Sequence, residues 1–178
     1  HNGILLAARV SGYKSIGALE KLPTAEYQGE LTIISRPWHI FKEAGNQIRA
    51  DYKLLTQNRH SASIGDKHTA VYNVENIFIE EGVSIKAAIL NADNGPIYLG
   101  KNSTVEEGAV IRGPFALGED STVNAQARMR GDISIGPKCK VGGEVSNSVI
   151  FGHSNKGHDG FLGNTVLGEW CNIGAGTN

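Results

Sequence analysis

A six-residue repeat of apolar side chains constrains the fold of this chain more than any other feature. Between residues 99 and 141 every sixth residue is large and apolar, and the residue two places earlier is usually small. This period matches neither the 3.6 residues of a helix nor the alternation of an ordinary strand. The repeating positions are Leu99, Val105, Ile111, Leu117, Val123, Met129, Ile135 and Val141.

A six-residue unit is one short strand plus one turn, and three units can close a triangular coil. The repeating residues then stack inside, and each coil buries its surface on its neighbours. The period therefore predicts a mainly β fold, a parallel β-helix of hexapeptide repeats, from about residue 77 onward. Cys139 and Cys171 each lie two residues before a repeating position, so we expect buried structural thiols rather than nucleophiles.

The chain before the repeat is more mixed. An apolar run covers residues 4–10, and alternating apolar residues predict a strand over residues 29–35. Pro37 then opens a stretch with apolar residues at three- and four-residue spacing, which predicts an amphipathic helix over residues 37–56. We expect its apolar stripe to pack against the neighbouring domain. Residues 57–76 are polar and read as a connector, with its two histidines in solvated loops.

Composition excludes several classes of function. The net charge is −1, from 17 basic and 18 acidic residues without a block of like charge, so neither nucleic acid nor a membrane surface is an expected partner. No apolar run approaches the ~20 residues of a membrane span. The two cysteines are too few for a disulfide scaffold, which favours a cytoplasmic location. Because the sequence starts at His1 and stops inside a Gly-rich run, we expect a fragment of a longer product.

The repeat slips between Val141 and Leu167. These residues are 26 apart, whereas four repeats would cover 24, so two extra residues are predicted in this segment. The segment also contains His153, Lys156 and His158. A local break in a consistent pattern is where functional residues are expected. The alternative is a single longer corner that is polar because it is exposed.

Two motifs in this part of the chain carry a resemblance to a known family. The sequence HDGFLG over residues 158–163 and the run NIGAGT over residues 172–177, together with the hexapeptide ladder, resemble the acetyltransferase half of the bifunctional N-acetylglucosamine-1-phosphate uridyltransferase and glucosamine-1-phosphate acetyltransferase family. The phrases NIFIEEGVSI, AILNADNGPIYLGK and NSVIFGHSNKGHDGFLGN are more closely similar to sugar nucleotidyltransferases of Bacteroidetes related to that enzyme. This second resemblance covers about residues 36–178.

The resemblance implies a left-handed β-helix that assembles as a homotrimer, with active sites between subunits. Residues 1–56 would be the C-terminal tail of a nucleotidyltransferase-like domain with its linking helix, residues 57–76 the connector, and residues 77–178 a β-helix truncated at its C-terminus. The Gly-rich nucleotide loop of such a domain is absent from this sequence. Nucleotidyl transfer, and the Mg²⁺ that it requires, would therefore depend on the missing domain.

The resemblance also implies an acetyltransferase site. His158 matches the catalytic base, and an imidazole with an ordinary pKa of ~6.5 suits proton removal from an amine near neutral pH. Asn172 matches an asparagine that contacts the amino sugar. The backbone of Gly174, Ala175 and Gly176 would border the acyl donor, acetyl-CoA. The implied activity is N-acetylation of an amino sugar or amino-sugar phosphate, without an acyl-enzyme.

The sequence departs from the family where the sugar phosphate is held. Phe161 stands in place of a tyrosine and so lacks its hydroxyl, and Ser146 stands where a lysine is expected. The arginine of the family's phosphate site falls at Arg128 or Arg130, and Lys156 is a candidate to replace the lost charge. These residues complete the predicted sugar-binding set.

Two alternatives compete with the acyltransferase. In the first, the β-helix only trimerises a sugar-phosphate nucleotidyltransferase. In the second, the spacing of His153 and His158 resembles that of the zinc ligands in γ-class carbonic anhydrases. A third histidine should lie a whole number of three-repeat coils upstream, but Leu117 and Ile135 occupy those positions, so no metal site is predicted.

Overall fold

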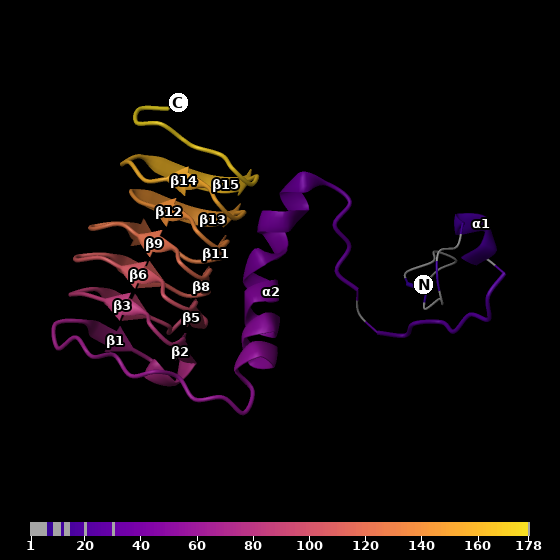
Figure 1. Cartoon of the computed structure of the whole chain (residues 1–178), viewed down its shortest axis with the longest axis horizontal. Helices are drawn as coiled ribbons and strands as arrows, with labels where there is room; N and C mark the ends of the chain where they lie inside the picture. The colour runs from indigo at the N-terminus through magenta and orange to yellow at the C-terminus, as the bar shows by residue number, and fades with distance from the viewer. Residues whose placement is uncertain (1–6, 9–11, 13–14, 20, 30, 178) are drawn as a thin grey trace. The chain divides into compact units, whose positions relative to one another are not determined.

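The computed structural model describes residues 7–8, 12, 15–19, 21–29 and 31–177, and the chain divides into two compact units. The first unit covers residues 1–33 and contains a short helix, α1 (Ile16–Leu19). The second unit covers residues 34–178 and contains helix α2 (Pro37–Thr56) together with the strands (Figure 1). The apolar run over residues 4–10 lies mostly outside the described residues.

The strand predicted over residues 29–35 is wrong for the residues that the structure describes. Gly29 and residues 31–35 are irregular, and Leu31, Ile33 and Ile34 are exposed. A strand needs a neighbour to accept its backbone hydrogen bonds. In the described part of the chain no strand pairs with this segment.

The strands form three faces of a triangular coil, and every pairing is parallel. Face 1 holds β1, β4, β7, β10 and the first halves of β13 and β15, and face 2 holds β2, β5, β8, β11 and their second halves. Face 3 holds β3, β6, β9, β12 and β14. The predicted mainly β fold, a parallel β-helix of repeats, is confirmed.

The elements have the following bounds: β1 (Ala70–Tyr72), the 3-10 helix η1 (Val74–Asn76), β2 (Ile77–Ile79), β3 (Ser84–Ile85), β4 (Ile89–Asn91), β5 (Ile97–Leu99), β6 (Thr104–Val105), β7 (Val110–Arg112), β8 (Phe115–Leu117), β9 (Thr122–Val123), β10 (Arg128–Met129), β11 (Ile133–Ile135), β12 (Lys140–Val141), β13 (Glu144–Ile150), β14 (Asn155–Lys156) and β15 (Phe161–Leu167).

The predicted apolar ladder forms the core of the coil. All eight of its side chains are at most 2% exposed. On face 3, Val105 pairs with Val123 and Val123 with Val141, so one coil takes three of the six-residue repeats. Since the ladder side chains are those that stack between coils, their burial accounts for the six-residue period.

At the corner between faces 2 and 3, small polar side chains link each coil to the next by hydrogen bonds. Ser121 Oγ accepts a hydrogen bond from the backbone N–H of Cys139 at 2.9 Å, Cys139 Sγ from that of Ser154 at 3.4 Å, and Ser154 Oγ from that of Cys171 at 3.0 Å. At this corner, the residue two places before the ladder position is therefore small and able to accept a hydrogen bond. Cys139 is buried, as predicted, and burial raises the pKa of its thiol; Cys171 is only partly buried.

Helix α2 begins and ends at the predicted residues. Pro37 occupies its first turn, where a missing N–H costs nothing. The helix runs beside the stacked strands and packs on β8, β11, β13 and β15 of faces 2 and 1 (Figure 1), burying Ala44, Gly45 and Ile48. Arg49 Nη2 donates to the carbonyl of Asn94 at 2.9 Å, which fixes the helix against the edge of the coil.

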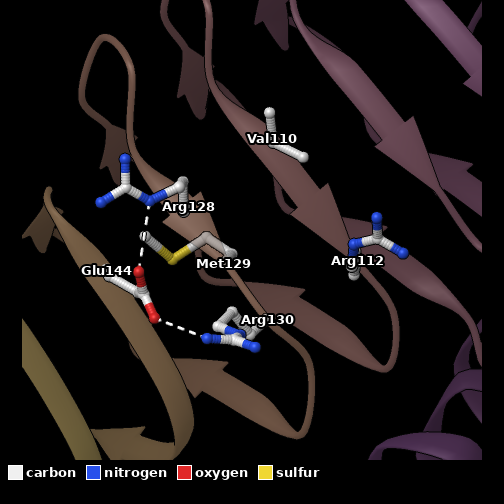
Figure 2. A pocket seen from close by; sticks show the side chains of 6 residues that line it. All are labelled: Val110, Arg112, Arg128, Met129, Arg130 and Glu144. Carbon is white, nitrogen blue, oxygen red and sulfur yellow. Dashed lines mark hydrogen bonds and ion pairs between the residues drawn. The ribbon is translucent and has the colours of Figure 1, made fainter.

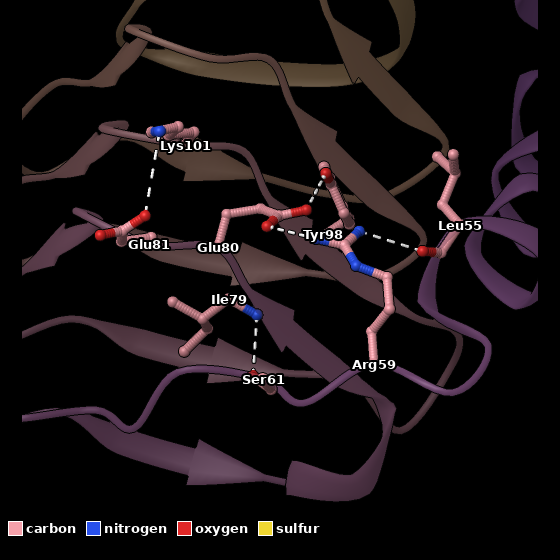
Figure 3. Close-up of polar contacts among 8 residues, drawn as sticks. All are labelled: Leu55, Arg59, Ser61, Ile79, Glu80, Glu81, Tyr98 and Lys101. Carbon is pink, nitrogen blue, oxygen red and sulfur yellow. Dashed lines mark hydrogen bonds and ion pairs between the residues drawn. The ribbon is translucent and has the colours of Figure 1, made fainter.

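The end of α2 is tied to the first coils by a polar cluster (Figure 3). Arg59 donates to the Leu55 carbonyl at 3.0 Å and to Glu80 Oε2 at 2.7 Å, and its guanidinium lies 5.0 Å from the ring centroid of Phe78. Tyr98 donates to Glu80 Oε1 at 2.6 Å. After this cluster, the first strand of the β-helix, β1, starts at Ala70, which lies inside the stretch predicted to be a connector.

The prediction of two extra residues after Val141 is wrong. Val123 to Met129 spans six residues, but the stretch paired with it, Val141 to Val145, spans only four. Interior positions continue at Val145, Ile150, Lys156, Leu162 and Leu167, in register with the coils on either side. The 26 residues from Val141 to Leu167 are therefore five shortened repeats, not four repeats with two residues added. The corner at Gly142 and Gly143 alone removes two residues.

Candidate functional site

Arginine side chains gather on face 1. Ile111 and Met129 point into the core, so the residues beside them in β7 and β10 point outward. The outward residues of β7 and β10, together with Arg130 after β10 and Glu144 of β13, border a groove of about 290 Å³, shown in Figure 2. The groove is lined by Val110, Arg112, Arg128, Arg130 and Glu144, with the core residue Met129 at its floor.

The groove carries more positive than negative charge. Glu144 accepts a hydrogen bond from Arg130 Nη1 at 2.7 Å and from Arg128 Nε at 3.3 Å, and both ion pairs are drawn in Figure 2. These bonds, chiefly that from Arg130, lower the pKa of the Glu144 carboxyl. Within the described residues the guanidinium of Arg112 has no hydrogen bond or ion pair. Two guanidinium groups paired with one carboxylate, beside a third without a described partner, suit an anionic ligand such as a phosphate.

Three of the predicted sugar-binding residues, Arg128, Arg130 and Phe161, lie on this same face. Arg128 pairs with Glu144 and Glu144 with Phe161, so the three side chains form one outward column. Ser146, two residues beyond Glu144, pairs with Gly163. Phe161 is 66% exposed and presents its ring to solvent. The structure therefore brings together predicted positions that are far apart in the sequence and lie on three successive coils.

His158 lies at the corner between faces 3 and 1, after β14 and three residues before Phe161 opens β15. Its side chain is exposed, and in the described part of the chain nothing hydrogen-bonds to its imidazole. Its backbone carbonyl packs against Gly143, where an added Cβ would lie 3.0 Å from the His158 oxygen. The imidazole is therefore at the edge of the arginine-bearing face and open to a substrate.

Lys156 occupies an interior position rather than the groove. Its side chain is 4% exposed and takes the place of the apolar ladder residue above Val141. Its ammonium donates to the carbonyls of Gly142, at 3.2 Å, and of His158. Burial lowers the pKa of Lys156, and the nearby charge of Asp159 opposes that shift.

The remaining predicted site residues lie outside the arginine groove. Asn172 forms an isolated bridge with Asn155 on face 3 and is exposed. Gly174, Ala175 and Gly176 follow it one coil beyond residues 157–159, at the corner between faces 3 and 1, and are exposed as well. Within one chain, Asn172 and the arginine groove lie on different faces.

The two histidines considered for zinc lie at different corners of the coil. His153 lies between faces 2 and 3, where its ring stacks on Trp170 with centroids 4.2 Å apart and planes at 6°. His158 lies between faces 3 and 1. Among the residues that the structure describes, no three or more His, Cys, Asp or Glu side chains are grouped to hold a metal ion.

Sequence reasoning missed two residues of the groove, Arg112 and Glu144. A signal existed for the first, because Arg112 and Arg130 are separated by three six-residue repeats and so stand on adjacent coils. The shortened corner at Gly142 and Gly143 hid the second, since it moves Glu144 out of the regular count. Counting outward positions by coil would have found Arg112.

The comparisons with known proteins bear on the N-terminal third of the chain. Residues 1–60 match the family model described as sugar nucleotidyl transferase, a match that includes α2 but ends before the first strand. No curated protein matches the chain significantly. The chain is thus related to sugar nucleotidyltransferases in the segment that leads into the β-helix. In its described part, no helix has the length and apolar character to span a bilayer.

Proposed function

We propose that the β-helix is an acyltransferase that N-acetylates an amino sugar or amino-sugar phosphate with acetyl-CoA, as part of a protein related to sugar nucleotidyltransferases. The observation that carries the proposal is the clustering on one face: an exposed imidazole at the corner, an exposed ring at Phe161, and arginines beyond it. An anionic sugar lying along this face would meet a base at one end and guanidinium groups at the other.

The reaction requires one general base and two binding surfaces, one for the sugar and one for acetyl-CoA. His158 takes a proton from the sugar ammonium, and the free amine attacks the thioester carbonyl of acetyl-CoA. A C–N bond forms, the tetrahedral intermediate collapses with cleavage of the C–S bond, the imidazolium gives its proton to the departing thiolate, and the acylated nitrogen loses its second proton to water. The products are the acetamido sugar and free CoA, and no acyl-enzyme forms.

Within one chain, Asn172 lies on face 3 and the Gly174–Gly176 backbone follows at the corner between faces 3 and 1, outside the arginine groove on face 1. A homotrimer would allow face 3 of one subunit to approach face 1 of the next, so that a single site contains both sets. The resemblance to trimeric β-helix acetyltransferases motivates this assembly. Light scattering tests it, because a monomer in solution would leave the site unassembled.

The decisive assay measures release of free thiol from acetyl-CoA. Amino sugars and their phosphates are supplied as acceptors to the protein and to His158→Ala, with His60→Ala as a matched control because His60 is an exposed histidine that precedes the coil. The proposal predicts acceptor-dependent thiol release that His158→Ala abolishes and His60→Ala retains. Thiol release at background level with every acceptor would contradict it.

A second function is favoured by the two departures in the sugar site. Phe161 provides no hydroxyl and Ser146 no positive charge, and the buried Lys156 does not reach the groove to replace that charge, so fewer groups can hold a sugar phosphate. Under this alternative the β-helix only trimerises a nucleotidyltransferase. A trimer without thiol release is the result expected from it.

A further inference from the structure

The corner that carries His158 packs on a shortened corner of the preceding coil, formed by Gly142 and Gly143, which we call the notch. The preceding coil turns this corner at Gly142 and Gly143 with two residues fewer than the coil before it. An added Cβ at Gly142 would lie 2.4 Å from the Gly157 carbonyl oxygen, and one at Gly143 would lie 2.6 Å from that of Gly160. Because this corner is two residues shorter, the backbone of residues 157–160 packs directly on Gly142 and Gly143.

Two polar side chains reach the backbone of this corner from other parts of the coil. Asn124 Nδ2, from below the notch, donates to the Gly157 carbonyl at 3.0 Å although the two residues are distant in sequence. Lys156 donates to the next carbonyl, that of His158, and also to Gly142. Both carbonyls that precede the Asp159 peptide are therefore held by side-chain donors.

The position of Lys156 is unusual for a lysine. Its place in the stack follows Ile85, Val105, Val123 and Val141, all of them apolar. Burying an ammonium costs several kcal/mol unless good acceptors surround it, and an apolar side chain of similar length would avoid that cost. The described partners that offset the cost are the carbonyls of Gly142 and His158.

We propose that Lys156 is a positioning residue for His158: its interior ammonium holds the His158 carbonyl and so fixes the direction in which the imidazole leaves the corner. The proposal rests on the acyltransferase function only for its effect on turnover. The contact itself does not depend on that function, and Lys156 on this view does not bind the substrate.

The contact can be observed directly, because His158-Asp159 is the only His-Asp pair in the sequence. In the full chain labelled with carbonyl-¹³C histidine and ¹⁵N aspartate, one carbonyl–amide NMR cross-peak reports the His158 carbonyl. We expect this peak to shift in Lys156→Met, which keeps the length but removes the donor. The matched control is Lys140→Met, an exposed lysine of the neighbouring strand β12, and it should leave the peak in place.

Stability and kinetics separate positioning from a general structural role. Lys156→Met should melt no lower than Lys140→Met, because an apolar isostere replaces a buried charge. Its kcat should fall by about tenfold or more with little change in KM, since small displacements of a catalytic group cost up to ~10²-fold. Lys156→Gln retains an amide donor and should give an intermediate peak position and kcat, which keeps the test available should the methionine variant not fold.

An unmoved cross-peak in both variants would overturn the proposal. So would an unchanged kcat in Lys156→Met together with a shifted peak, because the contact would then not affect the base. If the unmodified protein releases no thiol, the acyltransferase function fails, and the cross-peak still decides whether Lys156 holds the corner.

Discussion

Tyr98 donates its phenolic hydroxyl to Glu80 Oε1 over 2.6 Å, and this hydrogen bond joins the first two coils. Burial, together with the bond to Glu80, raises the pKa of Tyr98 to about 12. Burial alone would raise the pKa of Glu80, but the bonds from Tyr98 and Arg59 outweigh it and the pKa is lowered. Near neutral pH the Tyr98 hydroxyl is therefore protonated and the Glu80 carboxyl is ionised.

The Tyr98–Glu80 bond predicts a loss of stability in alkali. An unfolded tyrosine titrates near ~10, so the contribution is complete below that pH and declines as the pH rises toward the folded pKa of about 12. Tyr98→Phe should cost about 1 kcal/mol at pH 8 and remove this decline. Urea unfolding followed by circular dichroism between pH 8 and 12 measures both, with exposed Tyr72→Phe as the control. Parallel alkaline declines in Tyr98→Phe and the unmodified protein would contradict the assignment.

Helix α2 should be held by Ile48 rather than by its exposed apolar residues. Ile48 is 7% exposed where the helix meets the coil, and Leu54 on the same helix is 74% exposed. Ile48→Ala should lower the free energy of unfolding by about 2 kcal/mol or more, through lost burial and the cavity it leaves. Leu54→Ala should change it by less than about 0.5 kcal/mol. Equal effects in chemical denaturation would show that the helix does not pack as described.

The fold could be predicted from the sequence because a triangular coil imposes its period directly on buried residues. Val105, Val123 and Val141 stack on each other, so their spacing is the length of a coil. The helix over residues 37–56 was predictable for the same reason, since its buried face repeats with the helical period. A segment such as residues 31–35 has the alternation of a strand but no partner strand among the residues that the structure describes, and local alternation cannot reveal that.

The break in the coil was miscounted because the count assumed an apolar interior. Lys156 occupies an interior position as a charged residue, and Gly142 and Gly143 remove two residues from a corner. Neither event leaves an apolar signature in the sequence. The outward groove was only partly predictable, because outward-facing residues such as Arg112 and Glu144 do not follow the apolar repeat and are brought together by strand register alone.

The arginine groove should bind anions more tightly when its carboxylate is neutralised. Glu144 occupies both Arg128 and Arg130, so Glu144→Gln should free these guanidinium groups and tighten binding of inorganic phosphate several-fold. Arg112→Ala should weaken binding by about tenfold, because it removes a guanidinium that has no other partner among the described residues. Titration calorimetry measures both affinities. Exposed Glu81→Gln, whose ion pair with Lys101 lies elsewhere on the coil, is the control. Equal affinity in all three variants would exclude the groove as an anion site.

The glycine corner below His158 should tolerate no side chain. Gly143 has φ +68, and an added Cβ would lie 2.6 Å from the Gly160 carbonyl oxygen. Gly108, at the equivalent corner two coils earlier, has φ +74, but an added Cβ there would make only ordinary van der Waals contacts, the closest at 3.4 Å. Gly108→Ala should therefore cost about 1 kcal/mol from the backbone alone. Gly143→Ala should cost roughly 3 kcal/mol, because the overlap adds to the same strain. Since the overlap lies with residues 158–160, Gly143→Ala should also shift the His158-Asp159 cross-peak, which Gly108→Ala should leave unchanged. If the two variants unfold at the same urea concentration, the notch does not hold the His158 corner as closely as the structure indicates.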